Sequence, residues 1–179
     1  MKYKHTYKTP EGFSDILMQS DGEALTALVF EGSRDIKKFS GGAKEGLIPI
    51  FGETVKWLDE YFSGKNPDFT PKYKIEGLTL FRKSVADEMN KIPYGETVTY
   101  ADIARSIAKK RGILKMSSQA VGGAVGFNPI CIIIPCHRVV GTGGSLTGYG
   151  GGIANKVALL RLEGALKEEF FVPKKGSAL

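Results

Sequence analysis

The sequence is poor in the residues from which disulfide frameworks and metal centres are built. Its 179 residues include two cysteines, Cys131 and Cys136, and two histidines, His5 and His137. So few cysteines provide no disulfide framework, and we expect both thiols to be reduced. Only the two histidines could complete a Cys-x4-Cys metal half-site. We therefore predict no metal ion, and the available chemistry rests on single side chains.

Long apolar runs are also missing. No run approaches the ~20 residues that a membrane-spanning helix needs, and no apolar stretch follows the basic N-terminus to form a secretory signal. Apolar residues make up 42% and charged residues 25% of the chain, a composition typical of soluble globular proteins. We expect no membrane partner and a cytoplasmic location, associated with the nucleoid if the source is prokaryotic.

Negative charge is scarce in the second half of the chain. Residues 1–76 carry 11 Lys and Arg against 12 Asp and Glu, whereas residues 77–179 carry 14 against 7. The second half therefore carries a net charge of +7 and the first half −1, which together give the chain its +6. This asymmetry favours an anionic partner there, with nucleic acid the first candidate. A basic surface that serves only solubility is the alternative that charge leaves open.

The first half predicts a small domain of strands and one helix. A helix is expected over Ile48–Tyr61, and the turn signal Asp21-Gly22 suits a tight hairpin. The expected strands are Tyr3–Lys8, Asp15–Ser20 and Ala24–Phe30. We therefore predict an α+β fold, with an N-terminal supporting domain over residues 1–76 and a mainly helical C-terminal domain over residues 77–179.

Three helix starts lie in the first part of the second half, before the Cys-His motif. Thr79 is a good N-cap for a helix that runs to Lys91, and Thr99 and Asp102 have the spacing of a capping box. Ser117 or Ser118 then caps a second short helix. Helix, connector and helix in this order indicate a helix-turn-helix within residues 77–179.

The second of these paired helices is nearly bare. Gly122 and Gly123, beside Ala120 and Ala124, leave it with almost no side chains. Two glycines cost a helix roughly 1 kcal/mol each, so some other pressure favours them. Close approach of the backbone to a partner is one such pressure, and a tight contact with the protein's own core is the other.

Cys136 follows an apolar run and precedes a histidine. Three isoleucines predict a strand over Ile132–Ile134, and Pro135 ends it because proline has no N–H to donate. Cys136 is then placed at the mouth of the strand. A neighbouring histidine or cation favours the thiolate, which is the nucleophilic form. The alternative is an inert core cysteine.

Glu163 is a candidate partner for that histidine. It follows Leu160 by three residues, on or beside the apolar stripe of a helix that begins near Ile153. A carboxylate on an apolar stripe needs a partner, and pairing with His137 would fix the tautomer of the imidazole and raise its basicity. The alternative is a Glu163 that extends into solvent.

Four motifs, one containing the cysteine and three around it, resemble a known family. Gly126-Phe127-Asn128-Pro129 stands upstream, and a glycine-rich loop with a Leu-Leu-x-x-Glu-Gly helix stands downstream. The central motif is Pro135-Cys136-His137-Arg138-Val139, and the downstream motifs are Gly148-Tyr149-Gly150-Gly151-Gly152 and Leu159-Leu160-Arg161-Leu162-Glu163-Gly164. Together they resemble the O6-alkylguanine-DNA alkyltransferases, also called methylated-DNA–protein-cysteine methyltransferases, from about Gly77 to Ala165.

The resemblance implies direct reversal of DNA damage without a cofactor. Members of this family flip a damaged guanine out of the duplex and take its O6-alkyl group onto a cysteine. The expected substrates are O6-alkylguanine and O4-alkylthymine in double-stranded DNA, which is bound through the minor groove. The expected reaction is a single, self-inactivating turnover, and we expect the protein to be a monomer.

The resemblance also assigns roles to residues. It makes Cys136 the acceptor, His137 a base acting through water, Glu163 the group that orients it, and Asn128 the residue that ties together the turns around the site. Tyr100 would donate to the flipped base, and main-chain carbonyls near Cys136 would accept from the guanine amino group. The residues implied on the substrate and DNA side are Tyr100, Gln119, Ala120, Gly122, Gly123, Arg138, Val139, Tyr149 and Gly150.

Two positions depart from the family pattern. Gln119 stands where the family often has an arginine that enters the base stack, and Gly150 stands where many members have serine after the pocket tyrosine. Two other functions remain open from the residues themselves. One is a Cys-His hydrolase with Asn128 and Glu163 as orienting groups, and the other is a DNA-binding regulator that uses residues 97–125.

Overall fold

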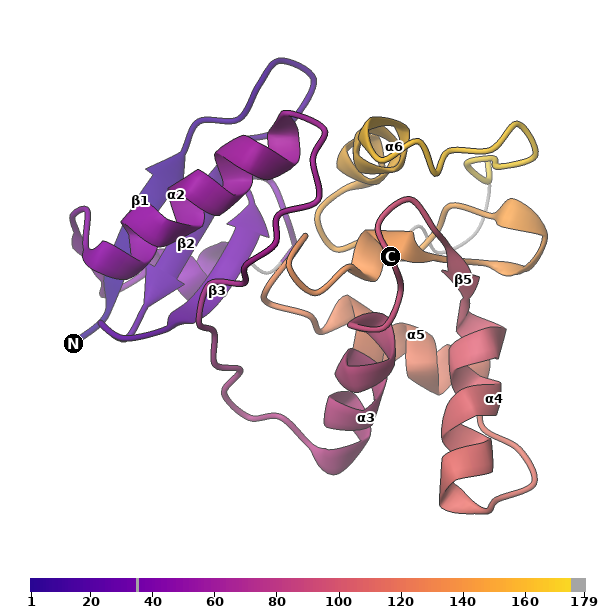
Figure 1. Cartoon of the computed structure of the whole chain (residues 1–179). Coiled ribbons are helices and arrows are strands. Elements are labelled where there is room, and N and C mark those ends of the chain that lie inside the picture. The colour runs from indigo at the N-terminus through magenta and orange to yellow at the C-terminus, as the bar shows by residue number, and fades with distance from the viewer. Residues whose placement is uncertain (35, 175–179) are drawn as a thin grey trace. The chain divides into compact units, whose positions relative to one another are not determined.

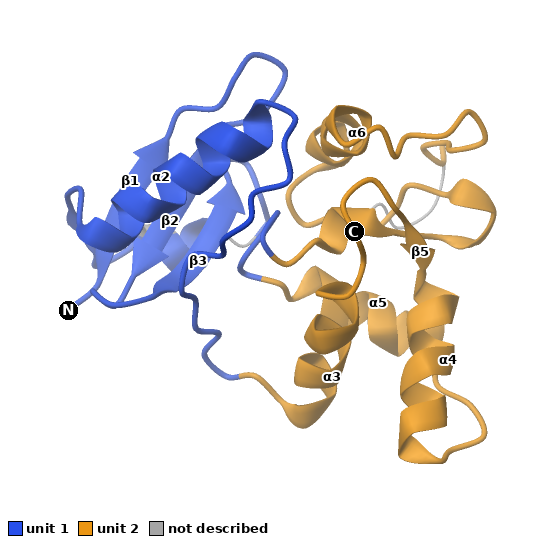
Figure 2. Ribbon diagram, viewed as in Figure 1, with its two compact units in different colours: residues 1–77, 129–133 blue, residues 78–128, 134–179 orange. Residues whose placement is uncertain are grey.

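A computed structural model describes residues 1–34 and 36–174, and the chain divides into two compact units (Figure 2). Unit 1 contains residues 1–77 and 129–133, and unit 2 contains residues 78–128 and the chain from residue 134 onward. The predicted α+β class is confirmed. In chain order, with η for 3-10 helices, the elements are β1 (Tyr3–Tyr7), β2 (Ile16–Ser20), β3 (Leu25–Phe30), α1 (Ile36–Ser40), β4 (Lys44–Glu45), α2 (Pro49–Phe62), α3 (Leu80–Met89), β5 (Val98–Thr99), α4 (Tyr100–Arg111), α5 (Ser118–Gly126), η1 (Cys136–Arg138), β6 (Val139–Val140), η2 (Thr142–Gly144) and α6 (Ile153–Leu162).

Unit 1 is built on a four-stranded sheet of order β3-β2-β1-β4. The first three strands are antiparallel neighbours, and β4 pairs in parallel with β1. The three predicted strands are confirmed to within one residue at each end. The turn between β2 and β3 spans Asp21–Ala24 and is wider than the tight hairpin expected, because the Asp21 carboxylate accepts from the N–H groups of Glu23 and Ala24.

Helix α2 lies along one face of this sheet (Figure 1). It starts one residue later than predicted. Trp57 stacks on Tyr61 with ring centroids 5.4 Å apart, and its indole N–H donates to the carbonyl of Phe69 at 2.9 Å. The hydroxyl of Tyr7 on β1 donates to Asp59 at 2.7 Å. The aromatic residues of α2 therefore serve the packing of unit 1.

The segment 129–133 belongs to unit 1 although it stands far along the chain. The N–H of Leu28 on β3 donates to the carbonyl of Pro129 at 2.8 Å, and the N–H of Cys131 donates to the carbonyl of Leu28 at 2.8 Å. These bonds form a parallel bridge between Leu28 and Ile130. Main-chain pairing thus fastens the stretch that precedes the Cys-His motif.

The strand predicted over Ile132–Ile134 is wrong. Ile132 has a φ of +70°, and among the described residues it is the only one other than glycine with positive φ. The N–H of Ile133 donates back to the carbonyl of Cys131 at 2.8 Å, which closes a γ-turn of the rare, strained kind. A left-handed conformation is costly for a β-branched residue, so composition favoured a strand where the backbone turns instead.

Unit 2 is mainly helical, and the predicted starts of α3, α4 and α5 are confirmed. Thr79 caps α3, and Thr99 and Asp102 form a full capping box at the start of α4. Ser117, rather than its neighbour, caps α5 by accepting from the N–H of Ala120 at 3.2 Å. The predicted order of helix, connector and helix is present as α4 and α5.

The remaining elements of unit 2 surround the Cys-His motif. Strand β5 pairs in parallel with β6, so the start of α4 is joined to the residues that follow η1. A small core joins this region to the end of α6; its buried members are Val140, Leu146, Leu160 and Ala165.

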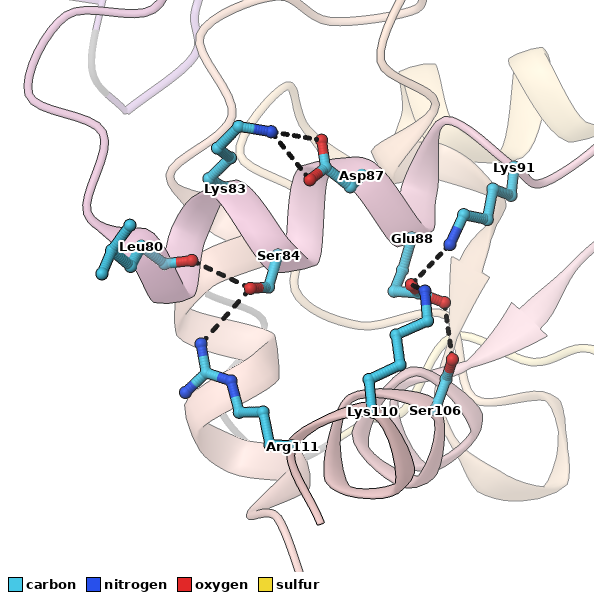
Figure 3. A network of polar contacts seen from close by, with 9 residues as sticks. All are labelled: Leu80, Lys83, Ser84, Asp87, Glu88, Lys91, Ser106, Lys110 and Arg111. Atoms are coloured by element: carbon cyan, nitrogen blue, oxygen red, sulfur yellow. Dashed lines mark hydrogen bonds and ion pairs between the residues drawn. The ribbon is translucent and has the colours of Figure 1, made fainter. Parts of the chain in front are cut away.

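A polar network joins α3 to α4 (Figure 3). The Glu88 side chain is 10% exposed and accepts from Lys91 Nζ at 2.7 Å, from Ser106 Oγ at 2.7 Å and from Lys110 Nζ. Burial by itself raises the pKa of Glu88, but the hydrogen bonds from Lys110, Lys91 and Ser106 outweigh it and lower the pKa to about 2. The carboxylate is therefore ionised when it holds the two helices together.

Replacing Glu88 should change how stability depends on pH. Because its folded pKa lies below that of an ordinary glutamate, about 4.3, ionised Glu88 stabilises the fold above that pH and loses its effect as the pH falls towards 2. We expect Glu88→Gln to lower the free energy of unfolding by about 1 kcal/mol at pH 6 after solvent screening, and by about half as much at pH 3. Urea unfolding at both pH values measures this difference. The exposed Glu96→Gln is the control, and an equal loss at both pH values would contradict the assignment.

Candidate active site

The backbone presents Cys136 at the start of a 3-10 turn. Pro135 has φ −82° and ψ 61°, and the N–H of Cys136 donates to the carbonyl of Ile134 at 2.8 Å. These values define an inverse γ-turn centred on the proline. Cys136 is 5% exposed. A defined turn therefore precedes the sulfur and sets the direction in which it points.

Asn128 connects the end of α5 to this turn. Its Nδ2 donates to the carbonyl of Ile134 at 2.9 Å and lies 3.0 Å from the Sγ atom of Cys136. The preceding residue, Phe127, packs its ring 3.7 Å beneath the guanidinium of Arg82 on α3. The side chain of Asn128 thus links the sulfur of Cys136 to the end of α5, the helix predicted to face a partner.

Glu163 is buried at the end of α6 and gathers three groups. Its Oε1 lies 2.8 Å from His137 Nε2, and the guanidinium of Arg138 donates to both carboxylate oxygens at 2.8 and 2.9 Å. The N–H of Gly95 donates to Oε2 at 3.2 Å. Arg138 also donates to the carbonyl of Ile92 at 2.8 Å. The solvent-exposed alternative for Glu163 is therefore wrong.

The electrostatics of this cluster fix its protonation. Burial raises the pKa of Glu163, but hydrogen bonds from His137 and Arg138 outweigh it and hold the pKa well below its usual range. Burial lowers the pKa of His137, and the attraction of Glu163 does not fully offset it. At neutral pH the pair is therefore a carboxylate and a neutral imidazole. The proton must lie on Nε2, which faces the carboxylate, so Nδ1 carries the lone pair.

Lys156 is a site residue that the sequence reasoning missed. It is 0% exposed, and its Nζ donates to the carbonyls of Val139 at 2.7 Å and Thr147 at 3.0 Å. Burial lowers the pKa of Lys156 to about 8, against the opposing attraction of Cys136. The ammonium also lies 6.0 Å from the centroid of the Tyr149 ring. A buried cation is thus placed in the electrostatic environment of the sulfur.

Tyr100 begins α4 and reaches the same region. Its hydroxyl donates to the carbonyl of Thr147 at 3.1 Å. Burial, and then the proximity of Cys136, raises the pKa of Tyr100 to about 12. The hydroxyl therefore keeps its proton at neutral pH and is a hydrogen-bond donor.

The bare face of α5 is open. Gln119, Ala120 and Gly123 are exposed, and Gly122 is half-buried. A Cβ added at Gly123 would meet nothing within 4 Å, and one added at Gly122 would meet only the Tyr100 ring at 3.9 Å. A tight contact with the protein's own core is therefore the wrong explanation for these glycines. Approach to a partner is the alternative that remains.

The other predicted substrate-side residues divide into two groups. Gly150 is exposed, whereas Val139 and Tyr149 are buried, at 0% and 5% exposure. Arg138 is also buried, and its guanidinium is engaged by Glu163. We therefore correct its assignment from DNA contact to the internal network, because a side chain held in this way does not face a partner.

Neither a cluster of metal ligands nor a membrane-spanning helix is found among the described residues. Within residues 1–34 and 36–174, no three His, Cys, Asp or Glu side chains come together as metal ligands. Over the same residues, no helix has the length and apolar character needed to cross a membrane. The candidate site is thus defined by the cysteine, its asparagine and the buried Glu-His-Arg cluster.

Comparison with known proteins gives matches along nearly the whole chain. Residues 80–165 match the family model "6-O-methylguanine DNA methyltransferase, DNA binding domain", and residues 2–74 match its "ribonuclease-like domain". A methylated-DNA–protein-cysteine methyltransferase of Methanosarcina acetivorans is 40% identical and aligns over 91% of this chain and 99% of its own length. One of Methanosarcina barkeri is 51% identical over 84% of this chain and 96% of its own length.

Solved structures agree with the sequence matches. The crystal structure of the Mycobacterium tuberculosis O6-methylguanine methyltransferase has a TM-score of 0.76 and 36% identity, covering 92% of this chain and 94% of that chain. A Mycobacterium tuberculosis protein solved in complex with DNA has a TM-score of 0.75 and 35% identity, covering 91% of this chain and 93% of that chain. The resemblance seen in the motifs is confirmed: this chain belongs to the 6-O-methylguanine DNA methyltransferase family, the methylated-DNA–protein-cysteine methyltransferases.

Proposed function

We propose that this protein repairs DNA by moving the alkyl group from O6 of a damaged guanine onto Sγ of Cys136. The observation that carries the proposal is the setting of that sulfur, held 3.0 Å from the amide of Asn128 beside the buried pair of His137 and Glu163. O4-alkylthymine is a second substrate, since its alkyl group is carried on an equivalent carbonyl-derived oxygen. No cofactor is required, because the protein supplies the nucleophile.

Proton transfer begins with the buried pair. The carboxylate of Glu163 holds the Nε2 proton of His137, so Nδ1 is the basic nitrogen. Nδ1 takes the thiol proton of Cys136 through a water molecule, the route that membership of the family implies. The charge of Lys156 favours the thiolate, because its ammonium is buried and the opposite charge interacts strongly with it at low dielectric.

Alkyl transfer is a displacement at carbon. The thiolate of Cys136 attacks the alkyl carbon, a C–S bond forms, and the C–O6 bond breaks with its electron pair passing to the guanine. Donors near O6 stabilise that developing charge. The Tyr100 hydroxyl is one donor. In the structure it donates to the carbonyl of Thr147, and it donates to O6 instead when the base is bound. The N–H of Gly150 is the other, and glycine in place of serine keeps it.

The product explains why one molecule acts once. A thioether on Cys136 has no sulfur–sulfur bond that a disulfide reductant could cleave. The amount of alkyl transferred therefore cannot exceed the amount of protein. The monomer is sufficient for this reaction, because every side chain named in the mechanism lies in unit 2 of one chain.

Helix α5 supports DNA as the carrier of the base. Its exposed Gly123 leaves the backbone open to approach, and the bare face suits docking of α4 and α5 as a helix-turn-helix in the minor groove. The damaged base is flipped to bring its alkyl group to a nearly buried sulfur. Gln119 is exposed at the start of α5, where it fills the vacated space without the charge that arginine would add.

The identity of the acceptor is tested by mass. After incubation of the protein with duplex DNA containing O6-methylguanine, we expect one methyl group per molecule, on Cys136 and not on Cys131. Cys136→Ala should take up no methyl group and still bind DNA. Intact mass followed by peptide mapping measures both. Repeated turnover would indicate a hydrolase, DNA binding without any methyl uptake would indicate a regulator, and methyl on Cys131 would contradict the assignment.

The open face of α5 is tested by a change with opposite effects on stability and binding. Alanine at an exposed helical glycine should raise the free energy of unfolding by up to about 1 kcal/mol. Because Gly123→Ala meets no atom of the protein, we expect that gain together with roughly tenfold weaker binding to duplex DNA, or about 1.4 kcal/mol. Urea unfolding and fluorescence titration measure the two effects.

The matched control is Gly52→Ala in α2 of unit 1, where an added Cβ also meets nothing within 4 Å. It should stabilise the protein to a similar extent and leave DNA binding unchanged. Equal DNA affinities for the two variants would remove the support for α5 as the DNA-facing helix.

A further inference from the structure

The connector between α4 and α5 is longer than a helix-turn-helix needs. It spans Gly112–Ser117, six residues, whereas such turns usually have about 3–4. Two apolar side chains lie at its tip: Leu114 is fully exposed and Ile113 is 44% exposed. Isolated exposed leucines are common, but here the pair stands next to a run of cations. The tip is therefore unusual in its composition and in its position.

Both ends of the connector are fixed by caps. Gly112 has φ 64° and ψ 28°, the left-handed cap of α4, and the N–H of Ile113 donates back to the carbonyl of Ala108 at 3.1 Å. This is the long hydrogen bond of a Schellman motif. At the other end, Ser117 caps α5. The apolar tip is thus held in place by the ends of two helices.

The three basic residues that precede the connector, Lys109, Lys110 and Arg111, do not all lie on the same side of α4. Lys110 bonds to Glu88, and Arg111 donates to Ser84 Oγ at 3.3 Å, so both are held on α3 (Figure 3). Lys109 lies instead on the groove between α4 and the connector. The charges of Lys110 and Arg111 therefore serve the fold, and that of Lys109 is presented outward.

This groove has a volume of about 400 Å³ and a strongly basic lining. Its cations are Arg105, Lys109 and Lys115, and no acidic residue lines it. Asp102 pairs with Arg105 and offsets its charge. Lys109 and Lys115 are therefore the main source of the positive electrostatic potential of the groove. The rest of its lining is small or apolar: Ala101, Ala104, Ala108, Ile113, Leu114, Met116 and Ser118.

We propose that this groove binds the phosphate backbone of one DNA strand next to the segment that contacts α5. Lys109 and Lys115 each neutralise a phosphate, and Leu114 packs against the adjoining sugar. The alanines of α4 form a floor that lets the backbone approach closely. This inference rests on the proposed function, since it assigns the same DNA a longer footprint.

DNA fits this surface better than other anionic partners. Ser118 lines the groove and is also the first residue of α5, so the groove continues directly into the proposed DNA-facing helix. A single leucine with one half-exposed isoleucine offers too little apolar area to hold the protein on a membrane surface. Both lysines line the groove without an acidic neighbour in that lining, which suits the repeated negative charge of a phosphate backbone.

The salt dependence of DNA binding tests the proposal. The dissociation constant of the full chain is measured on an undamaged duplex over a range of salt concentrations. Each neutralised phosphate contributes about 0.9 to the slope of log affinity against log salt. We expect the slope to fall by about 0.9 for Lys109→Gln and for Lys115→Gln, and by about 1.8 for the double variant. Leu114→Ser should weaken binding about threefold with the slope unchanged.

A matched control removes a lysine that is already paired. Lys83→Gln makes the same charge change on α3, where Asp87 holds the ammonium at 2.9 Å, and it should leave the slope unchanged. Shortening the duplex from the side that reaches the connector should abolish the difference between the double variant and the unchanged protein. A double variant with the original slope on the long duplex would overturn the proposal, as would weaker binding to phosphatidylserine vesicles with unchanged binding to DNA.

The proposed function can fail separately from this inference. Methyl uptake by Cys136 from a saturating concentration of alkylated duplex should stay at one per molecule in the double variant. If the unchanged protein takes up no methyl group, the proposed function fails. If it takes up the group and the salt slope does not respond to the two lysines, only the connector inference fails.

Discussion

The site depends on one buried carboxylate. Glu163 holds the imidazole of His137, both arms of the Arg138 guanidinium and the N–H of Gly95. A charge inside a protein is costly unless it is paired and hydrogen-bonded. Here the groups that pair with the carboxylate belong to other segments of unit 2, so satisfying the charge also fixes the positions of those segments. The same interaction that satisfies the charge therefore joins α6 to η1 and to the loop before β5.

That pairing sets the base, and further hydrogen bonds position the sulfur and the helices that we propose to face DNA. Holding Nε2 protonated leaves Nδ1 of His137 as the base, and Asn128 ties Cys136 to the end of α5. At the start of unit 2, Glu88 fastens α3 to α4. Side-chain hydrogen bonds therefore hold the nucleophile in place, and a separate set holds the helix α4 that we propose to face DNA.

The sequence predicted those features that depend on residues a few positions apart or on the burial of a single charge. The capping box at Thr99 and the pairing of Glu163 with a histidine followed from short-range spacing and from the cost of a carboxylate on an apolar stripe. The turn at Ile132 was not predictable, because isoleucine favours strands and its left-handed conformation is imposed by the hydrogen bonds around it. Lys156 was missed and Arg138 was assigned to DNA contact for another reason. Long cations are mostly exposed, and only the fold supplies the carbonyls and the carboxylate that let these two be buried.

The protonation of His137 is the most direct test of the account. The chain has only two histidines, so the imidazole nitrogens of His137 and His5 can be assigned by ¹⁵N NMR on the full protein. Because burial lowers the pKa of His137 and Glu163 is ionised, we expect a neutral ring with its proton on Nε2 between about pH 6.5 and pH 8. A cationic His137 at neutral pH, or a neutral ring with its proton on Nδ1, would contradict the central claim that Glu163 sets the base for Cys136.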